Sequence, residues 1–507
     1  MRDMERDKFY ITTAIAYVNA APHIGFALEL IQSDAIARYH RLRGDDTYFL
    51  TGTDEHGVKI HETAKEAGIP TRELVDKNTE KFKKLCEVLS LSNDDFIRTG
   101  ESRHKSAAQK IWKRLEENGD IYRDVYKGNY CVGCEAFILD KDLDEEGNCP
   151  NHKKKPEILE EENYFFKLSK YSDKIKKAIE SDDLLILPLS RKNEMLNLIG
   201  DEGLRDVSFS RPKSLLPWGI EVPGDESQVM YVWCDALSNY ISALDYENDG
   251  ELFKKFWPCD AHVIGKDILR FHAGIWIGML FSLGIPLPKS ILVHGFITSE
   301  GQKMSKSLGN VVDPFEYVDK YGVEALRYYL LREIPTMDDG DFAHKRFKDL
   351  YNSELANSLG NLVNRILMMT ERYCDAKVPK RAAGGEMEKI IEKFFDDYEK
   401  AFEKFDLKAA CECIVDLTDY ANKYIDDEKP WIKAKEKSDV GEVMYRLLEI
   451  LRVLAVLLVP ILPESSSKIA SCLNLKVEDL KLEKGWGILE EGTPIKSSGV
   501  LFPRIEE

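Results

Sequence analysis

In the first hundred residues, strand-like runs alternate with segments in which apolar positions recur at helical steps. β-Branched and aromatic residues fill 9–13, as is typical of a buried strand. From Ile24 onward apolar residues recur at three- and four-residue steps, which predicts a helix with one apolar face. A second strand is predicted over 46–51, and helical spacing returns over 62–67, 71–89 and 102–118. This alternation predicts an α/β domain with a parallel sheet.

The loop between the first strand and the first helix carries the first candidate chemistry. His23 and Gly25 lie at the expected start of the helix, where free backbone N–H groups and the positive dipole end attract an anion. Glycine lets a phosphate approach the backbone, and an imidazole can donate to a phosphate oxygen. A nucleotide site is therefore one interpretation, and a simple helix cap by His23 is the other.

A second polar loop, 52–57, follows the strand over 46–51. In open parallel sheets ligands bind at the carboxyl ends of the strands. Asp54 in this loop could hold an ammonium group. A turn or cap carboxylate is the alternative role for this residue.

Strand-like runs resume after residue 225. A β-rich run over 229–233 and another over 261–264 precede aromatic residues at helical steps, which are typical of a core unless they lie just beyond strand ends. A further strand is predicted over 290–298. It leads into the loop 299–310, in which Lys303 and Lys306 are suited to meeting phosphate charge as it develops.

Four soft metal ligands occur in two close pairs. Cys131 and Cys134 form one pair, and Cys149 and His152 form the other, with the same spacing. Two such turns can present four donors to one Zn²⁺ ion tetrahedrally. A closed set of four protein ligands predicts a structural rather than a catalytic metal.

Composition narrows the class of protein. Ten cysteines in 507 residues are too few for a disulfide scaffold, and the net charge of −18 argues against indiscriminate nucleic-acid binding. The first eight residues are too charged for a secretory signal, and the longest apolar run, 453–462, is far shorter than the roughly 20 residues of a membrane helix. We therefore expect a cytoplasmic protein.

The motifs together resemble a known enzyme family. His23-Ile24-Gly25 near the N-terminus and Lys303-Met304-Ser305-Lys306-Ser307 resemble the signature pair of class I aminoacyl-tRNA synthetases. Within that class, the segments 51–57, 264–268, 317–333 and 422–431 and the single zinc knuckle resemble the methionyl-tRNA synthetase family. The resemblance covers nearly the whole chain.

The resemblance implies the following domain organisation. A Rossmann-like catalytic domain is split by a zinc-binding connective insertion and is followed by an all-α anticodon-binding bundle, with helical spacing of apolar residues over 387–405 and 414–424 in agreement. The expected divisions are 1–121 and 226–315 for the two catalytic halves, 122–225 for the insertion, 316–352 for a stem-contact region and 353–507 for the bundle.

The resemblance also implies the reaction and its partners. Methionine and ATP, with Mg²⁺, would form methionyl-adenylate, and the methionyl group would pass to the terminal adenosine of its tRNA. Asp54 would hold the amino group of methionine. The side-chain pocket would comprise Ile15, Tyr17, Trp233, Ala236, Tyr240, Ile268, Phe271, His272 and Trp276.

Phosphate chemistry and tRNA recognition are assigned in the same way. Catalysis would rest mainly on His23 and Lys306, with Lys303 and Lys266 in support. Further nucleotide contacts would come from Gly25, Phe26, Asp267, Met304, Ser305 and Ser307. Asn361, Arg365 and Trp431 match positions that recognise the anticodon in the family, where an unpaired base can stack on an indole.

The chain departs from the family pattern in three respects. Phe26 stands where a second histidine is usual, so one phosphate-facing donor is missing. Ala16 and Leu237 replace prolines found in some members. The chain also ends without the oligonucleotide-binding module that often accompanies dimerisation, and we therefore expect a monomer.

Three other functions are weighed against this one. Synthetases for branched amino acids carry a larger editing insertion than 122–225, and a cysteine enzyme would place zinc at the substrate thiol. A plain nucleotidylyltransferase would have no use for a helical bundle. A catalytically silent RNA-binding protein gains some support from Phe26, but the retention of Asp54, Lys303 and Lys306 argues against it.

Overall fold

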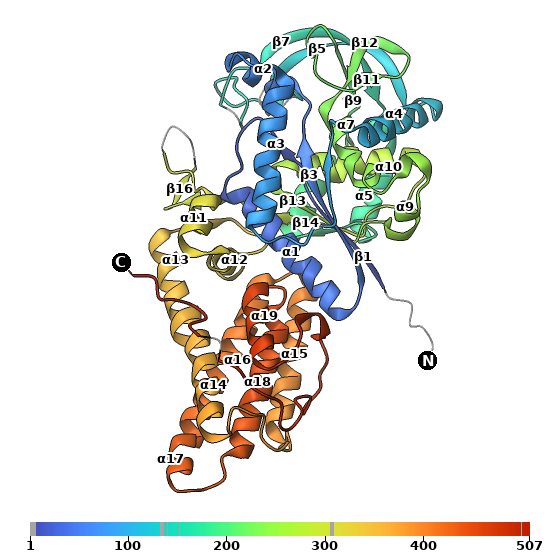
Figure 1. Cartoon of the computed structure of the whole chain (residues 1–507). Coiled ribbons are helices and arrows are strands. Elements are labelled where there is room, and N and C mark those ends of the chain that lie inside the picture. Colours follow the sequence, from blue (N-terminus) through green and yellow to red (C-terminus); the bar gives the residue numbers. More distant parts are fainter. Residues whose placement is uncertain are drawn as a thin grey trace.

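The computed structural model describes residues 7–131, 136–138, 140–151, 153–304, 309–497 and 499–506. A sheet-containing body forms the upper part of the molecule in Figure 1, and a bundle of long helices forms the lower part. Among the described residues, no helix is both long enough and apolar enough to cross a bilayer.

The centre of the upper body is a parallel sheet of seven strands in the order β2-β3-β1-β13-β14-β8, with β4 also paired to β3. Every pairing in it is parallel. The strands are β1 (Lys8–Thr13), β2 (Ala16–Tyr17), β3 (Asp46–Asp54), β4 (Asp95–Arg98), β8 (Leu185–Leu187), β13 (Ala261–Gly265) and β14 (Ser290–His294). The predicted Rossmann-like fold class is therefore confirmed.

The strand order reverses at β1, which has β3 on one side and β13 on the other. In doubly wound sheets this switch point opens a crevice at the carboxyl ends of the strands, and ligands bind there. The loops that follow β1, β3 and β13 therefore share one edge of the sheet.

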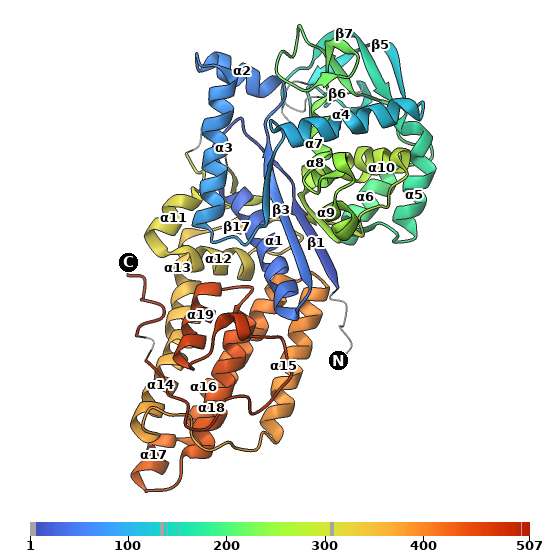
Figure 2. The ribbon, with the colours of Figure 1, turned by 45° about the vertical axis from the view of Figure 1, so that its right-hand side comes forward.

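Helices cover both faces of this sheet. On one face lie α1 (Ile24–Arg43) and α3 (Thr71–Val88), and on the other lie α4 (Ser102–Glu117) and α10 (Ile277–Leu283) (Figure 2). Successive side chains of β1 alternate between these layers, because a strand has a period of two. Phe9 and Ile11 join the core around α1, whereas Tyr10 joins the core around α4.

The segment between the two sheet halves forms a separate antiparallel ribbon. Its order is β6-β5-β7-β9, and the long β5·β7 pair lies at the top of Figure 1. Between β7 and β9 the chain returns to the main sheet, where β8 pairs with β14 as the outermost strand. The sheet thus includes a strand from within 122–225. The elements are β5 (Ile121–Cys131), β6 (Ala136–Ile138), β7 (Glu157–Phe166), α5 (Ser172–Glu180), α6 (Leu189–Ile199), β9 (Val207–Ser208), β10 (Ser210–Pro212), β11 (Glu221–Val222) and β12 (Asp225–Met230).

The strand predicted over 290–298 is broken into two. After β14 the chain bends at Gly295 and Phe296 and continues as β15 (Ile297–Ser299), which belongs to a small sheet with β16 (Gln302–Lys303) and β17 (Gly340–Phe342). The break occurs because Gly295 lies against another backbone segment: a Cβ there would lie 2.3 Å from the carbonyl carbon of Asp338. A propensity pattern contains no information on such a distant neighbour.

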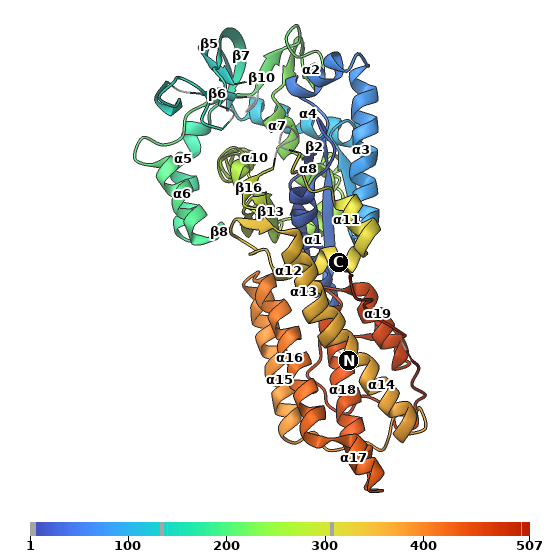
Figure 3. The same ribbon diagram turned by 90° about the vertical axis from the view of Figure 1, so that its left-hand side faces the viewer.

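Helices make up most of residues 361–472, as the apolar spacing over 387–405 and 414–424 predicts. The C-terminal segment then returns along the bundle toward α13 (Figure 3), and the side chain of Asn352 exchanges two hydrogen bonds with the backbone of Ile505. The helices of the lower body and its connection are α11 (Pro314–Tyr321), α12 (Val323–Arg332), α13 (His344–Leu350), the π-helical η6 (Tyr351–Gly360), α14 (Asn361–Tyr373), α15 (Glu386–Glu403), α16 (Leu407–Glu428), α17 (Pro430–Lys435), α18 (Gly441–Leu458) and α19 (Pro463–Cys472).

One buried arginine joins the two bodies. Arg327 on α12 is fully buried and forms an ion pair with Asp34 on α1, at 2.8 Å. Its guanidinium also donates to the carbonyl oxygens of Leu89, Pro460 and Ile461 at 3.0 to 3.3 Å. The planar fork of arginine suits several acceptors at once. A single side chain on α12 therefore connects the helix layer of the sheet with the bundle.

Replacing Arg327 should destabilise the whole chain. We expect Arg327→Met to lower the free energy of unfolding by about 3 kcal/mol, because Asp34 and three buried carbonyls lose their shared partner. The free energy of unfolding of Arg327→Lys should lie between those of the wild type and Arg327→Met, because an ammonium cannot match the fork geometry of the guanidinium. Urea unfolding followed by circular dichroism measures the loss. Lys345→Met, which removes an exposed pair with Asp349, serves as the control and should change the value by less than about 0.5 kcal/mol.

Candidate active site and anticodon surface

His23 caps the helix that organises the site. It is the N-cap of α1, and its Nδ1 accepts a hydrogen bond from the backbone N–H of Gly25 at 3.1 Å. Burial lowers the pKa of His23, so the ring is neutral near pH 7. With Nδ1 acting as acceptor, the ring proton resides on Nε2. The two interpretations of His23 are thus compatible: the cap leaves Nε2–H as a donor.

Phe26 packs into the protein instead of presenting a donor. Its ring meets Phe82 of α3 edge to face, with centroids 5.2 Å apart, and lies 4.7 Å from the His23 ring. An edge-to-face pair adds about 1 kcal/mol beyond area burial. The residue that departs from the family pattern therefore supports the packing of the loop.

A buried acid–base pair lies at the same sheet edge. Glu29 of α1 and Nε2 of His294, the last residue of β14, are 2.8 Å apart. Burial alone would lower the pKa of His294, but the carboxylate of Glu29 raises it overall. Gly265 ends β13 beside His294, and a Cβ on Gly265 would lie 2.9 Å from Oδ1 of Asp267. The α1 layer and the β13 turn thus meet at the switch point.

Lys266 and the first residues of the signature loop lie on two different elements, η4 (Lys266–Ile268) and β16. Lys266 is held by Asp339, with both carboxylate oxygens 2.7 Å from its Nζ. Lys303 is exposed on β16, opposite Thr298, and Met304 is half-buried against the core around α1. Ser305, Lys306 and Ser307 lie outside the described residues.

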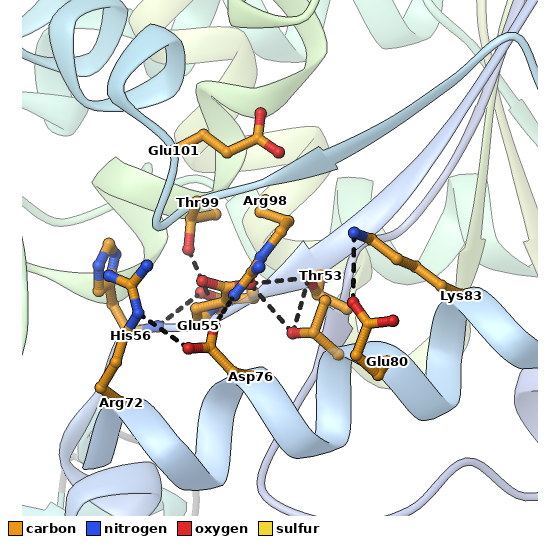
Figure 4. A network of polar contacts seen from close by, with 12 residues as sticks. Thr53, Glu55, His56, Arg72, Asp76, Glu80, Lys83, Arg98, Thr99 and Glu101 are labelled. Atoms are coloured by element: carbon orange, nitrogen blue, oxygen red, sulfur yellow. Dashed lines mark hydrogen bonds and ion pairs between the residues drawn. The ribbon is translucent and has the colours of Figure 1, made fainter. Parts of the chain in front are cut away.

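The loop that carries Asp54 is fixed from several directions. Asp54 ends β3, is buried and accepts a hydrogen bond from the His56 backbone at 3.3 Å. Beside it, the buried Glu55 pairs with Arg98 and accepts from the hydroxyls of Thr53 and Thr79, the former shown in Figure 4. The network therefore prevents Glu55 from competing with Asp54 for a cation at the strand end.

Asp235 links this loop to the opposite layer. Its carboxylate bonds His56 Nδ1 at 2.6 Å and His104 Nε2 at 2.7 Å, and all three side chains are buried. Burial alone would raise the pKa of Asp235, but the two histidines lower it to about 2. Because Asp235 lies between Trp233 and Ala236 in α7 (Val232–Leu237), the network positions one wall of the expected amino-acid pocket.

Aromatic rings line that expected pocket. Trp233 stacks on Phe271 with centroids 3.8 Å apart, and the hydroxyl of Tyr240, in α8 (Asn239–Ser242), bonds Nε2 of His272 at 2.7 Å. Nδ1 of His272 donates to the Ile268 carbonyl at 3.0 Å, and burial lowers the pKa of His272 to about 4. His272 is therefore neutral at pH 7, and its Nε2 accepts from the tyrosine.

The other expected pocket residues differ in how deeply they are buried. Ile15, Tyr17 and Ile268 are half-buried against the same core, and Ala236 is buried. Trp276 is fully buried behind Tyr240, where its indole N–H meets Nε2 of His262 at 3.3 Å. Phe271 and His272 belong to a π-helical turn, η5 (Phe271–Trp276). Such turns inside helices are frequent at functional sites.

Sequence patterns alone did not reveal several of these residues. Asp235 and His104 bond each other, and Glu29 bonds His294 at the end of β14. His262 contacts Trp276, and Asp339 pairs with Lys266. Of these residues, only Asp235 carried a local signal, because it lies between two pocket positions. The partners of His104, Glu29 and Asp339 lie more than 70 residues away in sequence, and His262, 14 residues before Trp276, is one polar residue in a buried strand.

The described half of the expected zinc set fits a metal site. Cys131 ends β5 and is buried, and Cys149 is buried in a tight turn in which it exchanges backbone hydrogen bonds with Lys153 and Lys154. Buried thiols on a strand end and a closed turn are typical of zinc knuckles. Cys134 and His152 lie outside the described residues.

The three expected anticodon residues lie on the bundle. Asn361 begins α14 and is exposed, and Arg365 follows one turn later on the same face. Arg365 bonds Asp426 near the end of α16 at 3.0 Å. Trp431 on α17 is 41% exposed, which is unusual for so large an apolar ring. The lower end of the bundle in Figure 1 carries α17.

Comparison with known proteins identifies the family. The family "tRNA synthetases class I (M)" matches residues 9–155 and 145–367, and "Anticodon binding domain of methionyl tRNA ligase" matches residues 378–507. A methionine–tRNA ligase of Brucella suis biovar 1 is 43% identical over 99% of both chains. Another, from Caldanaerobacter subterraneus subsp. tengcongensis, is 45% identical over 98% of this chain and 79% of its own length.

Solved structures agree with these sequence matches. Mycobacterium tuberculosis methionyl-tRNA synthetase in complex with methionyl-adenylate superposes with a TM-score of 0.91, at 38% identity, over 98% of this chain and 100% of that chain. The free-state structure of the enzyme from the same organism gives a TM-score of 0.87 at 35% identity. Family, relatives and fold coincide over both bodies of the molecule, and this chain therefore belongs to the methionyl-tRNA synthetase family.

Proposed function

We propose that this chain activates methionine with ATP, releases pyrophosphate, and transfers methionine from the adenylate to the 3′-terminal adenosine of tRNA(Met). The convergence of the loops after β1, β3 and β13 on one sheet edge is the observation that carries the proposal. The start of α1 capped by His23, the buried carboxylate of Asp54 and the stacked rings of Trp233 and Phe271 are the groups that would meet phosphate, ammonium and thioether there. A binding protein without chemistry would not need the first two together.

In the first step the methionine carboxylate attacks the α-phosphorus in line, and pyrophosphate leaves. Negative charge develops on the phosphate oxygens, so positioned donors lower the barrier. We assign this role to Nε2–H of His23 and to Lys306, with Lys266 and Lys303 in support. Gly25, Phe26, Asp267, Met304, Ser305 and Ser307 complete the proposed nucleotide contacts. Mg²⁺ bound with ATP would neutralise part of the phosphate charge.

The amino acid is held by charge at one end and by shape at the other. Asp54 would pair with the ammonium group. The thioether would lie among the rings of Trp233, Tyr240 and Phe271, since sulfur makes favourable contacts with aromatic edges. The Tyr240–His272 bond is neutral and so suits an apolar side chain.

In the second step the tRNA must be held at both of its ends. A terminal ribose hydroxyl attacks the carbonyl carbon of the adenylate, and AMP leaves. We propose that Asn361, Arg365 and Trp431 recognise the anticodon by hydrogen bonding and stacking. Arg365 would exchange Asp426 for a base or a phosphate.

We propose the same domain divisions as the resemblance implies: catalytic halves 1–121 and 226–315, insertion 122–225, stem-contact region 316–352 and bundle 353–507. One Zn²⁺ ion would be held by Cys131, Cys134, Cys149 and His152, and it would cross-link the knuckle. A location in the cytoplasm, where tRNA is charged, fits these substrates.

Amino-acid-dependent ATP–pyrophosphate exchange tests the first half-reaction directly. We expect the purified chain, with Mg²⁺ and without tRNA, to exchange label with methionine and with none of the other nineteen amino acids at comparable rates. Absence of exchange with every amino acid, in folded zinc-loaded protein, would contradict the proposal and favour a tRNA-binding role.

Removing the Nε2–H donor should slow adenylate formation. We expect His23→Ala to reduce kcat of the exchange reaction by about 10² to 10³, as for other oxyanion-type donors, while KM for methionine stays within about twofold. His61→Ala on α2 (Val58–Glu66), whose imidazole bonds Thr71, is the matched control and should retain the wild-type rate. A His23→Ala enzyme with more than half the wild-type kcat would exclude His23 from the chemistry.

The neutral state of His272 should appear in the pH dependence of stability. The folded protein keeps this ring unprotonated until about pH 4, whereas the unfolded chain takes up the proton below about pH 6.5. Its contribution is therefore present above pH 6.5 and is lost as the pH falls toward 4. His272→Gln, which does not titrate, should lose about 2 kcal/mol less stability than the wild type between pH 7 and pH 5. Equal losses in urea titrations at both pH values would refute the assignment.

A further inference from the structure

Lys266 is already paired in the structure. Its partner, Asp339, directly precedes β17, a strand of the small sheet in which β16 carries the start of the signature loop. Asp339 places both oxygens 2.7 Å from Nζ of Lys266, and the ammonium also lies 4.5 Å from the centre of the Phe296 ring. The Lys266 side chain is 20% exposed and that of Asp339 is 59% exposed. The ion pair is therefore in contact with water.

The position of Asp339 is fixed by the backbone around it. Its Oδ1 accepts a hydrogen bond from the N–H of Phe296 at 2.8 Å, and the N–H of Gly340 donates to the Phe296 carbonyl at 2.9 Å. Gly295 permits this contact, because a Cβ there would overlap the backbone of Asp338. The bonds from Lys266 and then from Phe296 hold the pKa of Asp339 below its usual value, so it is ionised at neutral pH.

The strand that follows Asp339, β17, also holds the hairpin that carries Lys303. Asp341 of β17 accepts hydrogen bonds from Gly301 N–H and from the Thr298 hydroxyl, at 2.7 and 2.6 Å. β17 runs parallel to β15, and β15 pairs with β16. One short segment therefore fixes both the hairpin turn, through Asp341, and Lys266, through Asp339.

We propose that Asp339 is a positioning residue. Its carboxylate pairs with Lys266 in the unliganded enzyme, and the nucleotide phosphates replace that carboxylate as the partner of Lys266 when ATP binds. This inference rests on the role proposed above for Lys266. A carboxylate–ammonium pair in contact with water is weak, so it exchanges readily. The triphosphate carries more charge than a carboxylate and displaces it. When pyrophosphate forms, Asp339 is again available to Lys266 and favours departure of the product.

The two functions of the carboxylate can be separated by substitution. Asp339→Asn removes the charge that competes for Lys266, but its amide oxygen can still accept from Phe296 N–H. Asp339→Ala removes both interactions. Asp338→Asn removes the same charge from the neighbouring exposed position and controls for general electrostatics. Lys266→Met, alone and combined with Asp339→Asn, completes the cycle.

The measurements are steady-state ATP–pyrophosphate exchange with MgATP and methionine, and inhibition of adenylate formation by inorganic pyrophosphate. We expect Asp339→Asn to lower KM for ATP and the inhibitory concentration of pyrophosphate by about threefold to fivefold, with KM for methionine unchanged. Asp338→Asn should move neither value. In the Lys266→Met background, Asp339→Asn should have no further effect. Asp339→Ala should additionally lower kcat, because the Phe296 backbone at the bend between β14 and β15 loses its side-chain acceptor.

The proposal is overturned if Asp339→Asn leaves both ATP and pyrophosphate parameters unchanged, if Asp338→Asn reproduces its effect, or if the effect persists without Lys266. These outcomes are distinct from failure of the proposed function. A silent Lys266→Met would remove Lys266 from the phosphate chemistry, and loss of exchange in the wild type would remove the reaction itself. Equal melting temperatures of the wild type and Asp339→Asn confirm that the comparison concerns folded protein.

Discussion

The buried ion pair between Arg327 and Asp34 is the interaction on which the geometry of the molecule most depends. Asp34 lies on α1, the helix whose first residue is capped by His23, and Arg327 lies on the helix that connects the signature hairpin to the bundle. A buried charge is tolerated only when it is paired and hydrogen-bonded on every side. The guanidinium meets this condition with three carbonyls from two segments, and the catalytic and tRNA-binding bodies therefore share one core.

α1 extends this connection from the core to the site. Near its C-terminal end Tyr39 stacks on Phe402 of the bundle, with ring centroids 4.2 Å apart. At its other end His23 caps the helix, and the first backbone N–H groups donate to the carbonyl oxygens of Val312 and His23 and to Nδ1 of His23. Because a helix is stiff over this length, the position of the His23 end is set by packing against the bundle. The proposed phosphate chemistry thus rests on contacts at the opposite end of the same element.

The site also separates charged from neutral groups by burial. Asp235, Glu55 and Asp34 are buried, and each is held by histidine or arginine, so these carboxylates are satisfied within the protein. The buried His272 and His262 bond the hydroxyls of Tyr240 and Thr12, and burial lowers the pKa of both histidines. The result is an apolar pocket beside a strongly polar strand end. Such a division suits an amino acid with an ammonium group and an uncharged side chain.

The sequence by itself determined the local elements and the family. Strand and helix periods depend on neighbouring residues, and the signature motifs are contiguous, so the α/β class, the helical bundle and the roles implied for His23 and Lys303 followed from the chain. Tertiary structure alone decided which distant residues meet. It broke the strand over 290–298 at Gly295, added β8 to the main sheet, joined Asp339 to Lys266 and placed Asp235 between two histidines. These contacts join segments far apart in the chain, and their energies depend on burial and close backbone approach, which no local pattern of residues encodes.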